Sequence, residues 1–439
     1  MGKKLNCAFK PYPFAWINET GKRYEISLVV LTKEDQIVKM TTLHNYIGDK
    51  KRTKLKYKQN SDDVRRICNF LNYVLFDNHW LYNTSNIADI PFSAVKSYIS
   101  DYSSIRTRFG YYPSAQSVEK ERNAVCLFMA NISQYRKDKK QHYYAKQIQG
   151  YSLQNNSVIP VSKWHENFIW NYEIQAEYVE NTKNKIIRDI PQDAIHVILK
   201  WIRLKAPDLY FAVILQLCAG LREGEVVNIR RATSCYYGGI QYTKENGQLT
   251  SFQVDLTSEY QLRSDGKAVG NIKRHRRQCV YPPLLLIVQK AYENHLKIVD
   301  DSSLETEKPM FANTYTDKTI HKKLALQKQS YCNRIERIVE KYVIPELLKS
   351  NNIELHAFAL SVNENGWGLH AFRHWYTVQL VLNGEDANSI AFFRGDSSTK
   401  TAFWYIQNKG ELLKRYTKVN DQISNELLQT ISRMELTND

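Results

Sequence analysis

Apolar residues recur at helical spacing in the stretch 61–146. The segment VRRICNFLNYVLF places Val64, Ile67, Leu71 and Val74 near one face of a helix, and AVKSYISDY and AVCLFMANISQY repeat the pattern after polar breaks. An amphipathic helix must bury its apolar face against a partner. The pattern therefore predicts a compact domain of about four helices.

A second helical region begins at DIP (189–191), where an N-cap residue and an early proline form a helix start signal. The helix that follows carries Ile195, Ile198 and Ile202 on one face. The next one, LYFAVILQLCA, is apolar throughout and ends at Gly220. Further helices are predicted at 319–349, at 371–383, in a short segment that ends at Gly395, and at 421–434.

Strand patterns are fewer and shorter than the helical ones. Within residues 14–47, RYEISLVVLT alternates apolar and polar side chains, and KEDQ at 33–36 is typical of a turn into a second strand. QLTSFQVDLT and the segment around 269–281 predict two more short strands. The chain is thus predicted to be mainly α-helical with small β-sheets, in several domains.

Size and composition indicate a globular cytoplasmic protein. The chain has 439 residues and a mass of 51.4 kDa, enough for about two or three domains. No window approaches a membrane-spanning apolar run, and the N-terminus lacks a secretory pattern, so we expect no membrane partner. The seven cysteines are scattered and include no CxxC pair, which argues against a disulfide framework and against a zinc site.

The charge balance favours a polyanionic partner. Lysine and arginine number 61 against 45 acidic residues, which gives a net charge of +16. The basic residues concentrate in three runs, KKRTKLKYK, RKDKKQHYYAK and KRHRR, and aromatic residues interleave with the second. Each run alone could be a solvated face, but together they suit nucleic-acid contact. The candidate contacts are Lys50, Lys51, Arg52, Lys54, Arg136, Lys137, Lys139, Lys140, Arg274, Arg276 and Arg277.

Four short stretches, in order along the chain, carry the candidate chemistry. CAGLREGEVVNIRR contains Arg222, NIKRHRRQCVYPP contains Lys273, GLHAFRHWYTVQL contains His370 and Arg373, and RGDSSTKTAFWYI contains Tyr405. Two arginines can hold one phosphodiester by forked hydrogen bonds and stabilise the charge that develops at phosphorus.

The other members of the set suit a reversible attack on that phosphodiester. A tyrosine is a fair nucleophile and a good leaving group, but its pKa of about 10 calls for a base or a positive field nearby. His370 can take the proton, and a lysine on a hairpin can supply one to the departing oxygen. This chemistry needs no metal, and no cofactor is expected. Tyr376 and Tyr416 compete with Tyr405 for the role of nucleophile, and Lys267, Arg274 and Arg276 compete with Lys273.

The four stretches resemble the motifs of the tyrosine recombinase (phage integrase) family. AGLREGEV is similar to its first-arginine motif, LHAFRH to its His-x-x-Arg box with the second histidine His374, and NIKRHRRQCVYPP to its lysine strand. The resemblance implies that Arg222 and Arg373 clamp a phosphate, Lys273 is the general acid, His370 the general base and Tyr405 the nucleophile. GDSSTKTAFWY departs from the family, because Asp396 stands where a histidine or tryptophan is usual. A carboxylate there would repel the phosphate unless it is protonated or paired with an arginine.

The resemblance also implies a domain organisation and an activity. We expect an N-terminal β unit and basic arm at 1–58, a helical core-site DNA-binding domain at 59–150, a linker at 151–186, and a catalytic domain at 187–420. A C-terminal helix at 421–439 is expected to exchange between protomers. The domains would form a C-shaped clamp on double-stranded DNA.

The expected product of such a clamp is integration or excision of a mobile element. Cleavage would proceed through a 3′-phosphotyrosyl link and a Holliday junction. The protein would be a tetramer on DNA, a monomer or weak oligomer off it, and nucleoid-associated in a bacterial cytoplasm, with accessory DNA-bending or directionality proteins as further partners. Two alternatives stay open: a type IB topoisomerase-like enzyme, and a non-catalytic DNA-binding relative, which Asp396 would allow.

Overall fold

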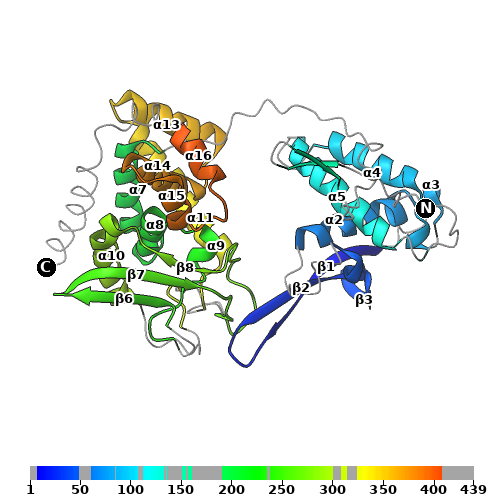
Figure 1. The fold of residues 1–439 in the computed structure, drawn as a ribbon, viewed down its shortest axis with the longest axis horizontal. Helices are drawn as coiled ribbons and strands as arrows, with labels where there is room; N and C mark the ends of the chain where they lie inside the picture. The colour runs from blue at the N-terminus through cyan, green and yellow to red at the C-terminus, as the bar shows by residue number, and fades with distance from the viewer. Residues whose placement is uncertain are drawn as a thin grey trace. The chain divides into compact units, whose positions relative to one another are not determined.

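The computed structural model describes residues 7–48, 61–84, 86–106, 112–132, 135, 151–154, 157–160, 190–234, 238–299, 308–313 and 324–407. The chain divides into two compact units, one of Met1–Trp16 with Tyr24–Lys183 and the other of Ile17–Arg23 with Asn184–Asp439. Helices dominate both units, and the sheets have two or three strands each, which confirms the predicted fold class (Figure 1). Among the described residues, no helix is long and apolar enough to cross a membrane.

The first unit packs a three-stranded sheet against a group of helices. Val64, Ile67, Leu71 and Val74 are buried as their spacing predicts, and Phe9 of the first strand joins the same core. The elements are β1 (Cys7–Ile17), β2 (Arg23–Lys33), β3 (Gln36–Met40), η1 (Leu43–Tyr46), α2 (Ser61–Asn72), η2 (Tyr73–Asp77), α3 (His79–Tyr82), η3 (Ile87–Asp89), α4 (Phe92–Ser104), α5 (Ala115–Ile132), β4 (Tyr151–Gln154) and β5 (Ser157–Pro160).

The turn predicted at KEDQ is present in this unit. β2 ends at Lys33 and β3 begins at Gln36, so Glu34 and Asp35 alone connect the two strands. Both have positive φ, 51° and 67°, as a tight hairpin turn of the mirror-image type requires. A different hairpin, β4–β5, lies in the stretch that the sequence suggested to be a linker.

The second unit is built around α8, a helix whose residues after Pro207 are all buried. Its apolar sequence allows this because other helices cover it on several sides: Figure 1 shows α7, α10 and α14 around it. The elements are α7 (Gln192–Lys205), α8 (Pro207–Ala219), α9 (Glu223–Val226), β6 (Ile240–Glu245), β7 (Gln248–Leu256), β8 (Arg276–Cys279), η5 (Pro282–Leu284), α10 (Leu285–Ile298), α11 (Lys328–Ile338), η6 (Val339–Val343), α12 (Ile344–Leu348), α13 (Ile353–Asn365), α14 (His370–Leu382), α15 (Ala387–Arg394) and α16 (Lys400–Gln407).

The sheet of this unit has the order β6-β7-β8, and both pairs are antiparallel. β6 and β7 form a hairpin whose turn contains Asn246 and Gly247, both with positive φ. The turn between β1 and β2 also belongs to this unit by its contacts, because Lys22 forms a β-bridge with Tyr260.

Gly220 ends α8 as the sequence predicts, and its conformation brings α14 close. Its φ is +62°, in the left-handed region, and a Cβ built there would lie 2.5 Å from the ring of Tyr376 on α14. Two requirements therefore exclude a side chain at this position: the backbone conformation, and the space that Tyr376 occupies.

We predict that Gly220→Ala destabilises the protein more than Gly384→Ala does. Gly384 also has a positive φ, +84°, but nothing lies within 4 Å of its added Cβ. Gly384→Ala should lower the free energy of unfolding by about 1 kcal/mol through the backbone alone. Gly220→Ala should cost about 2 kcal/mol more, because the ring of Tyr376 must move. Urea unfolding of both variants measures this, and equal losses would contradict the close approach.

Candidate active site

Two arginines from distant parts of the chain converge on a single carboxylate oxygen. Arg222 is the N-cap of α9, and Arg373 lies in the first turn of α14. The Nη2 atoms of both donate to Oδ1 of Asp396, over 3.0 Å from Arg222 and 2.8 Å from Arg373. The predicted pair of arginines is therefore brought together, and the point at which they meet is occupied by an anionic oxygen.

Arg373 is the more deeply placed of the two, with its side chain 0% exposed. Its Nη1 also donates to the backbone carbonyl of Gly220, at the end of α8. Burial, and then the charges of Arg222 and Arg394, lower the pKa of Arg373 to about 9, while the charge of Asp396 opposes this shift. The guanidinium thus remains charged at neutral pH.

Asp396 lies in the turn after α15 and is held by a third arginine. Its Oδ2 accepts a hydrogen bond of 2.7 Å from Nε of Arg394. Burial by itself would raise the pKa of Asp396, but the charges of Arg373, Arg394 and Arg222 and the hydrogen bond from Arg394 outweigh it and hold the pKa below its usual value. The carboxylate is therefore ionised, and it is paired with arginines as its position requires.

A glycine immediately before Asp396 lets β8 approach this turn. Gly395 has a φ of +65°, and a Cβ there would collide with the side chains of Arg276 and Gln278. Gln278 donates to the backbone carbonyl of Phe393 over 2.6 Å, and Arg274 donates to the backbone carbonyl of Asp396. The lysine-containing segment and the turn of Asp396 are thus packed together.

Glu225 holds two arginines in place by hydrogen bonds. It is fully buried and accepts hydrogen bonds from the backbone N–H and Nη1 of Arg222, over 3.0 and 3.2 Å. Its two oxygens also receive the fork of Arg276, over 2.9 and 3.0 Å. Burial would raise the pKa of Glu225, but these arginines lower it overall. Arg276, predicted as a DNA contact, is therefore engaged within the protein, whereas Arg277 is exposed.

Tyr405 packs beside Arg394, a member of this cluster. It is on α16, is 5% exposed, and its ring centroid is 5.0 Å from that of His374 in an edge-on contact. The guanidinium carbon of Arg394 is 5.6 Å from the same ring. Arg394 therefore contacts both Asp396 and the tyrosine. The competing Tyr376 is buried in α14 against Gly220, away from solvent.

The other two predicted catalytic residues lie at the surface. His370 is the first residue of α14 and is exposed. Lys273 is exposed in a bend just before β8, so the expectation that it lies on a hairpin strand is wrong: the hairpin is β6–β7. The loop of Lys273 is anchored by backbone packing, since a Cβ on Gly224 would lie 2.7 Å from the carbonyl oxygen of Asn271.

Sequence reasoning missed three side chains that the structure places in the cluster: Glu225, His374 in its contact with Tyr405, and Arg394. Glu225 is three residues after Arg222, a spacing typical of a capping interaction, and Arg394 is two residues before the unusual Asp396. The basic runs at 50–54 and 136–140 and the helix at 421–439 lie outside the described residues. Within the described residues, no group of histidine, cysteine and acidic side chains could hold a metal ion.

Comparison with known proteins finds similar solved structures that are described as recombinases or integrases. No family model and no curated protein matches the sequence. A structure of the Tn1549 transposon integrase with transposon right end DNA has 12% identity, covers 84% of this chain and 97% of its own, and gives a TM-score of 0.45. XerH site-specific recombinase bound to difH substrate has 14% identity, covers 82% of this chain and 79% of its own, and gives a TM-score of 0.44. A lambda integrase dimer bound to a core site has 10% identity, covers 90% of this chain and 95% of its own, and gives a TM-score of 0.39. These structures belong to the family that the four motifs resemble.

We predict that Glu225→Gln destabilises the protein in a pH-dependent way. Because its pKa is depressed on folding from a usual value of 4.5, its contribution is present above that pH and is lost as the pH falls through the folded value. At pH 7 the free energy of unfolding of the variant should be about 3 kcal/mol lower than that of the wild type, because Arg222 and Arg276 lose the buried carboxylate that they share. The difference from wild type should shrink in acid. Exposed Glu364→Gln is the control, and a loss that does not change between pH 7 and pH 3 would contradict the pairing.

Proposed function

We propose that this protein is a site-specific DNA recombinase that cuts and rejoins DNA through a 3′-phosphotyrosyl intermediate. The observation that carries the proposal is the convergence of Arg222 and Arg373 on one anionic oxygen, with Tyr405 beside the same cluster. Two guanidinium groups that share one carboxylate oxygen have the geometry to share a non-bridging phosphate oxygen.

The proposed reaction exchanges one phosphodiester for another. The oxygen of Tyr405 forms a bond to phosphorus, and the bond from phosphorus to the 5′ oxygen breaks. Arg222 and Arg373 stabilise the charge on the five-coordinate phosphorus. The tyrosine proton passes to a histidine, and we assign His370 or His374 to that role; Lys273 protonates the departing 5′ oxygen. Attack by a 5′-hydroxyl of a partner strand reverses the step, so no high-energy cofactor is consumed.

The burial of Tyr405 implies a movement before cleavage. Its side chain is enclosed by His374 and Arg394, while its neighbour Trp404 is 57% exposed on the same helix. A tyrosine that is 5% exposed offers a duplex phosphate little access. We therefore propose that α16 shifts when DNA binds, and that the segment after it, residues 421–439, couples this shift to a neighbouring protomer in a tetramer.

The proposed partner is double-stranded DNA carrying specific recombination sites. The net charge of +16 supports this, as do the printed descriptions of the similar structures, which are recombinases and integrases bound to DNA. Two rounds of strand exchange through a Holliday junction would integrate or excise a mobile element. Accessory DNA-bending or directionality proteins would join the tetramer.

Asp396 supports a second candidate function, that of a DNA binder with little or no cleavage. Its carboxylate occupies the place that we assign to the phosphate oxygen, so a phosphate must displace it. Arg394, which already binds Oδ2, is the residue that could retain the displaced carboxylate. The enzyme is favoured, because Arg394 balances the charge of Asp396 and leaves the pair Arg222 and Arg373 cationic.

We predict that Tyr405→Phe retains DNA binding and forms no covalent adduct. The substitution removes only the phenolic oxygen, so the fold and the arginine cluster should persist. A nicked suicide substrate carrying the element's own end sequence would trap the adduct on a denaturing gel. Tyr376→Phe is the control and should still form it. An adduct with the Tyr405→Phe protein would move the nucleophile elsewhere.

We also predict that Asp396→Asn retains or raises the rate of adduct formation. Asparagine has nearly the same shape but no charge, so the phosphate no longer competes with an anion for Arg222 and Arg373. Asp396→His should behave similarly. A tenfold loss of rate in both variants, about 1.4 kcal/mol of barrier, would show instead that the carboxylate is a required partner of Arg373.

A further inference from the structure

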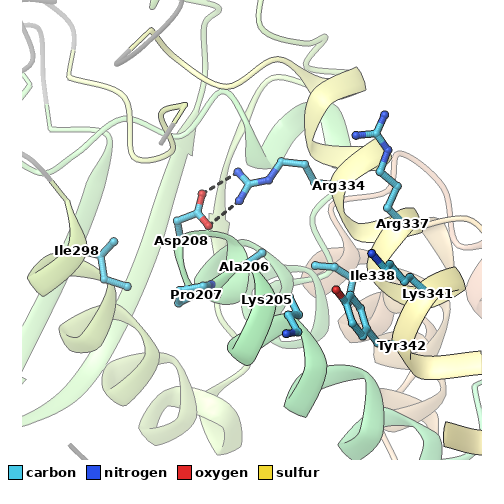
Figure 2. A pocket seen from close by; sticks show the side chains of 10 residues that line it. All are labelled: Lys205, Ala206, Pro207, Asp208, Ile298, Arg334, Arg337, Ile338, Lys341 and Tyr342. Atoms are coloured by element: carbon cyan, nitrogen blue, oxygen red, sulfur yellow. Dashed lines mark hydrogen bonds and ion pairs between the residues drawn. The ribbon is translucent and has the colours of Figure 1, made fainter. Parts of the chain in front are cut away.

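A second cationic site lies at the other end of α8. A cavity of about 570 Å³ opens where α7 meets α8, and its wall includes residues of α11 and η6 (Figure 2). Arg222 follows the C-terminal end of α8, whereas Pro207 at its N-terminal end lines the cavity. A helix of 13 residues is about 20 Å long, so the cavity is separate from the arginine cluster around Asp396.

The charged residues that line the cavity are four cations and one acid, and the acid is already paired with one of the cations. Asp208 receives both ends of the Arg334 fork, each over 2.7 Å, as the dashed lines in Figure 2 show. Lys205, Arg337 and Lys341 have no carboxylate partner within the described part of the chain. Three positive charges therefore face this space without compensation from the protein.

The helical segment that carries Arg337 and Lys341 also carries two acids, but among the described residues neither forms an ion pair with these cations. Arg337 and Lys341 are four residues apart on α11 and η6, and so are Glu336 and Glu340, one position earlier. Burial, and then the charges of Glu340 and Glu223, raise the pKa of Glu336, so the acids face other acids. Like charges at this spacing destabilise a helix. A bound polyanion would offset that cost on the cationic side.

An aromatic ring orders the cations around the cavity. Tyr342 stacks on Trp201 with ring centroids 4.9 Å apart, and the ammonium groups of Lys205 and Lys341 lie 4.9 and 5.6 Å from the Tyr342 ring. Figure 2 shows both lysines beside this ring. The ring attracts the two charges and holds them near each other without neutralising them.

We infer that this cavity binds the phosphodiester backbone of DNA outside the segment that is cleaved. The inference rests on the proposed function, which supplies the DNA. From Arg337 to Lys341 the chain advances four residues, about 6 Å along a helix, which matches about two phosphates of one strand of a duplex. Lys205 faces this row from the other wall. The contact is expected to be independent of DNA sequence, because the polar groups that line the cavity are charged side chains and one tyrosine, which suit phosphate.

The salt dependence of DNA binding tests this inference on the full-length protein. Equilibrium binding to a duplex several helical turns long should be measured over a range of salt concentrations for the wild type, Arg337→Gln, Lys341→Gln and the double variant. Both side chains are exposed, so the fold should tolerate the changes. The slope of log K against log salt should fall by about one unit in each single variant and about two in the double variant. Lys349→Gln, which removes an exposed charge at the C-cap of α12, outside the cavity lining, is the matched control and should leave the slope unchanged.

The outcomes separate this site from the proposed reaction. If the double variant and the Lys349→Gln control share the wild-type slope, the inference is overturned, while adduct formation by Tyr405 still tests the enzyme. If inorganic tripolyphosphate raises the melting temperature of the wild type but not of the double variant, and the DNA slope is unaffected, the cavity is a small-anion site and the assignment to DNA is wrong. Failure of the wild type to bind any duplex would overturn the proposed function itself.

Discussion

The charge of one fully buried arginine constrains the whole second unit. A guanidinium without water costs several kcal/mol unless partners compensate it closely. Arg373 finds them at two points, the carbonyl of Gly220 at the end of α8 and the carboxylate of Asp396 after α15. The end of α8, the start of α14 and the turn after α15 must therefore meet at one place. The rigid, buried α8 fixes the first of these points.

The negative charge of Asp396, at a position where the resembling family has histidine or tryptophan, is compensated by Arg394. A lone carboxylate between Arg222 and Arg373 would leave a phosphate little charge to bind. Arg394 is buried, binds the second oxygen of Asp396 and also donates to Thr377 of α14, so it belongs to the same rigid group. Arg276 balances Glu225, and three further arginines face one aspartate, so the cluster keeps a net charge of two for the proposed phosphate. The substitution at position 396 and the arginine at position 394 therefore act as a pair.

The sequence was sufficient where local pattern determines structure. The helices around Val64 and Ile198, the turn at Glu34 and Asp35, and the glycine ends of α8 and α15 all follow from spacing and backbone preference. Motif order also predicted that Arg222, Arg373 and Tyr405 act together, and the fold brings them near one another.

The remaining features of the site depend on tertiary contacts, which cannot be predicted from the spacing of residues in the sequence. The pairing of Arg276 with Glu225 joins β8 to α9, and the sequence, which predicted a DNA contact for Arg276, did not indicate this pairing. Lys273 lies before its strand because β8 begins only at Arg276, and strand ends are not determined by the sequence pattern alone. Which of His370 and His374 faces the tyrosine depends on where α16 packs on α14. Two histidines one helical turn apart could not be distinguished from the sequence.

The site divides into a fixed part and a peripheral part, and that division suits a reversible reaction. The arginines sit on α9, α14 and the end of α15, all held by buried hydrogen bonds and by the core around α8. Tyr405 sits on α16, the last element described, whose neighbours Phe403 and Trp404 are exposed. In the proposed reaction the arginines form a phosphate clamp that must keep its geometry through cleavage and rejoining, whereas Tyr405 as the nucleophile must approach and withdraw. Because α8 links the clamp to the basic cavity at its far end, DNA held at that cavity would be held at a fixed distance from the clamp while the tyrosine moves.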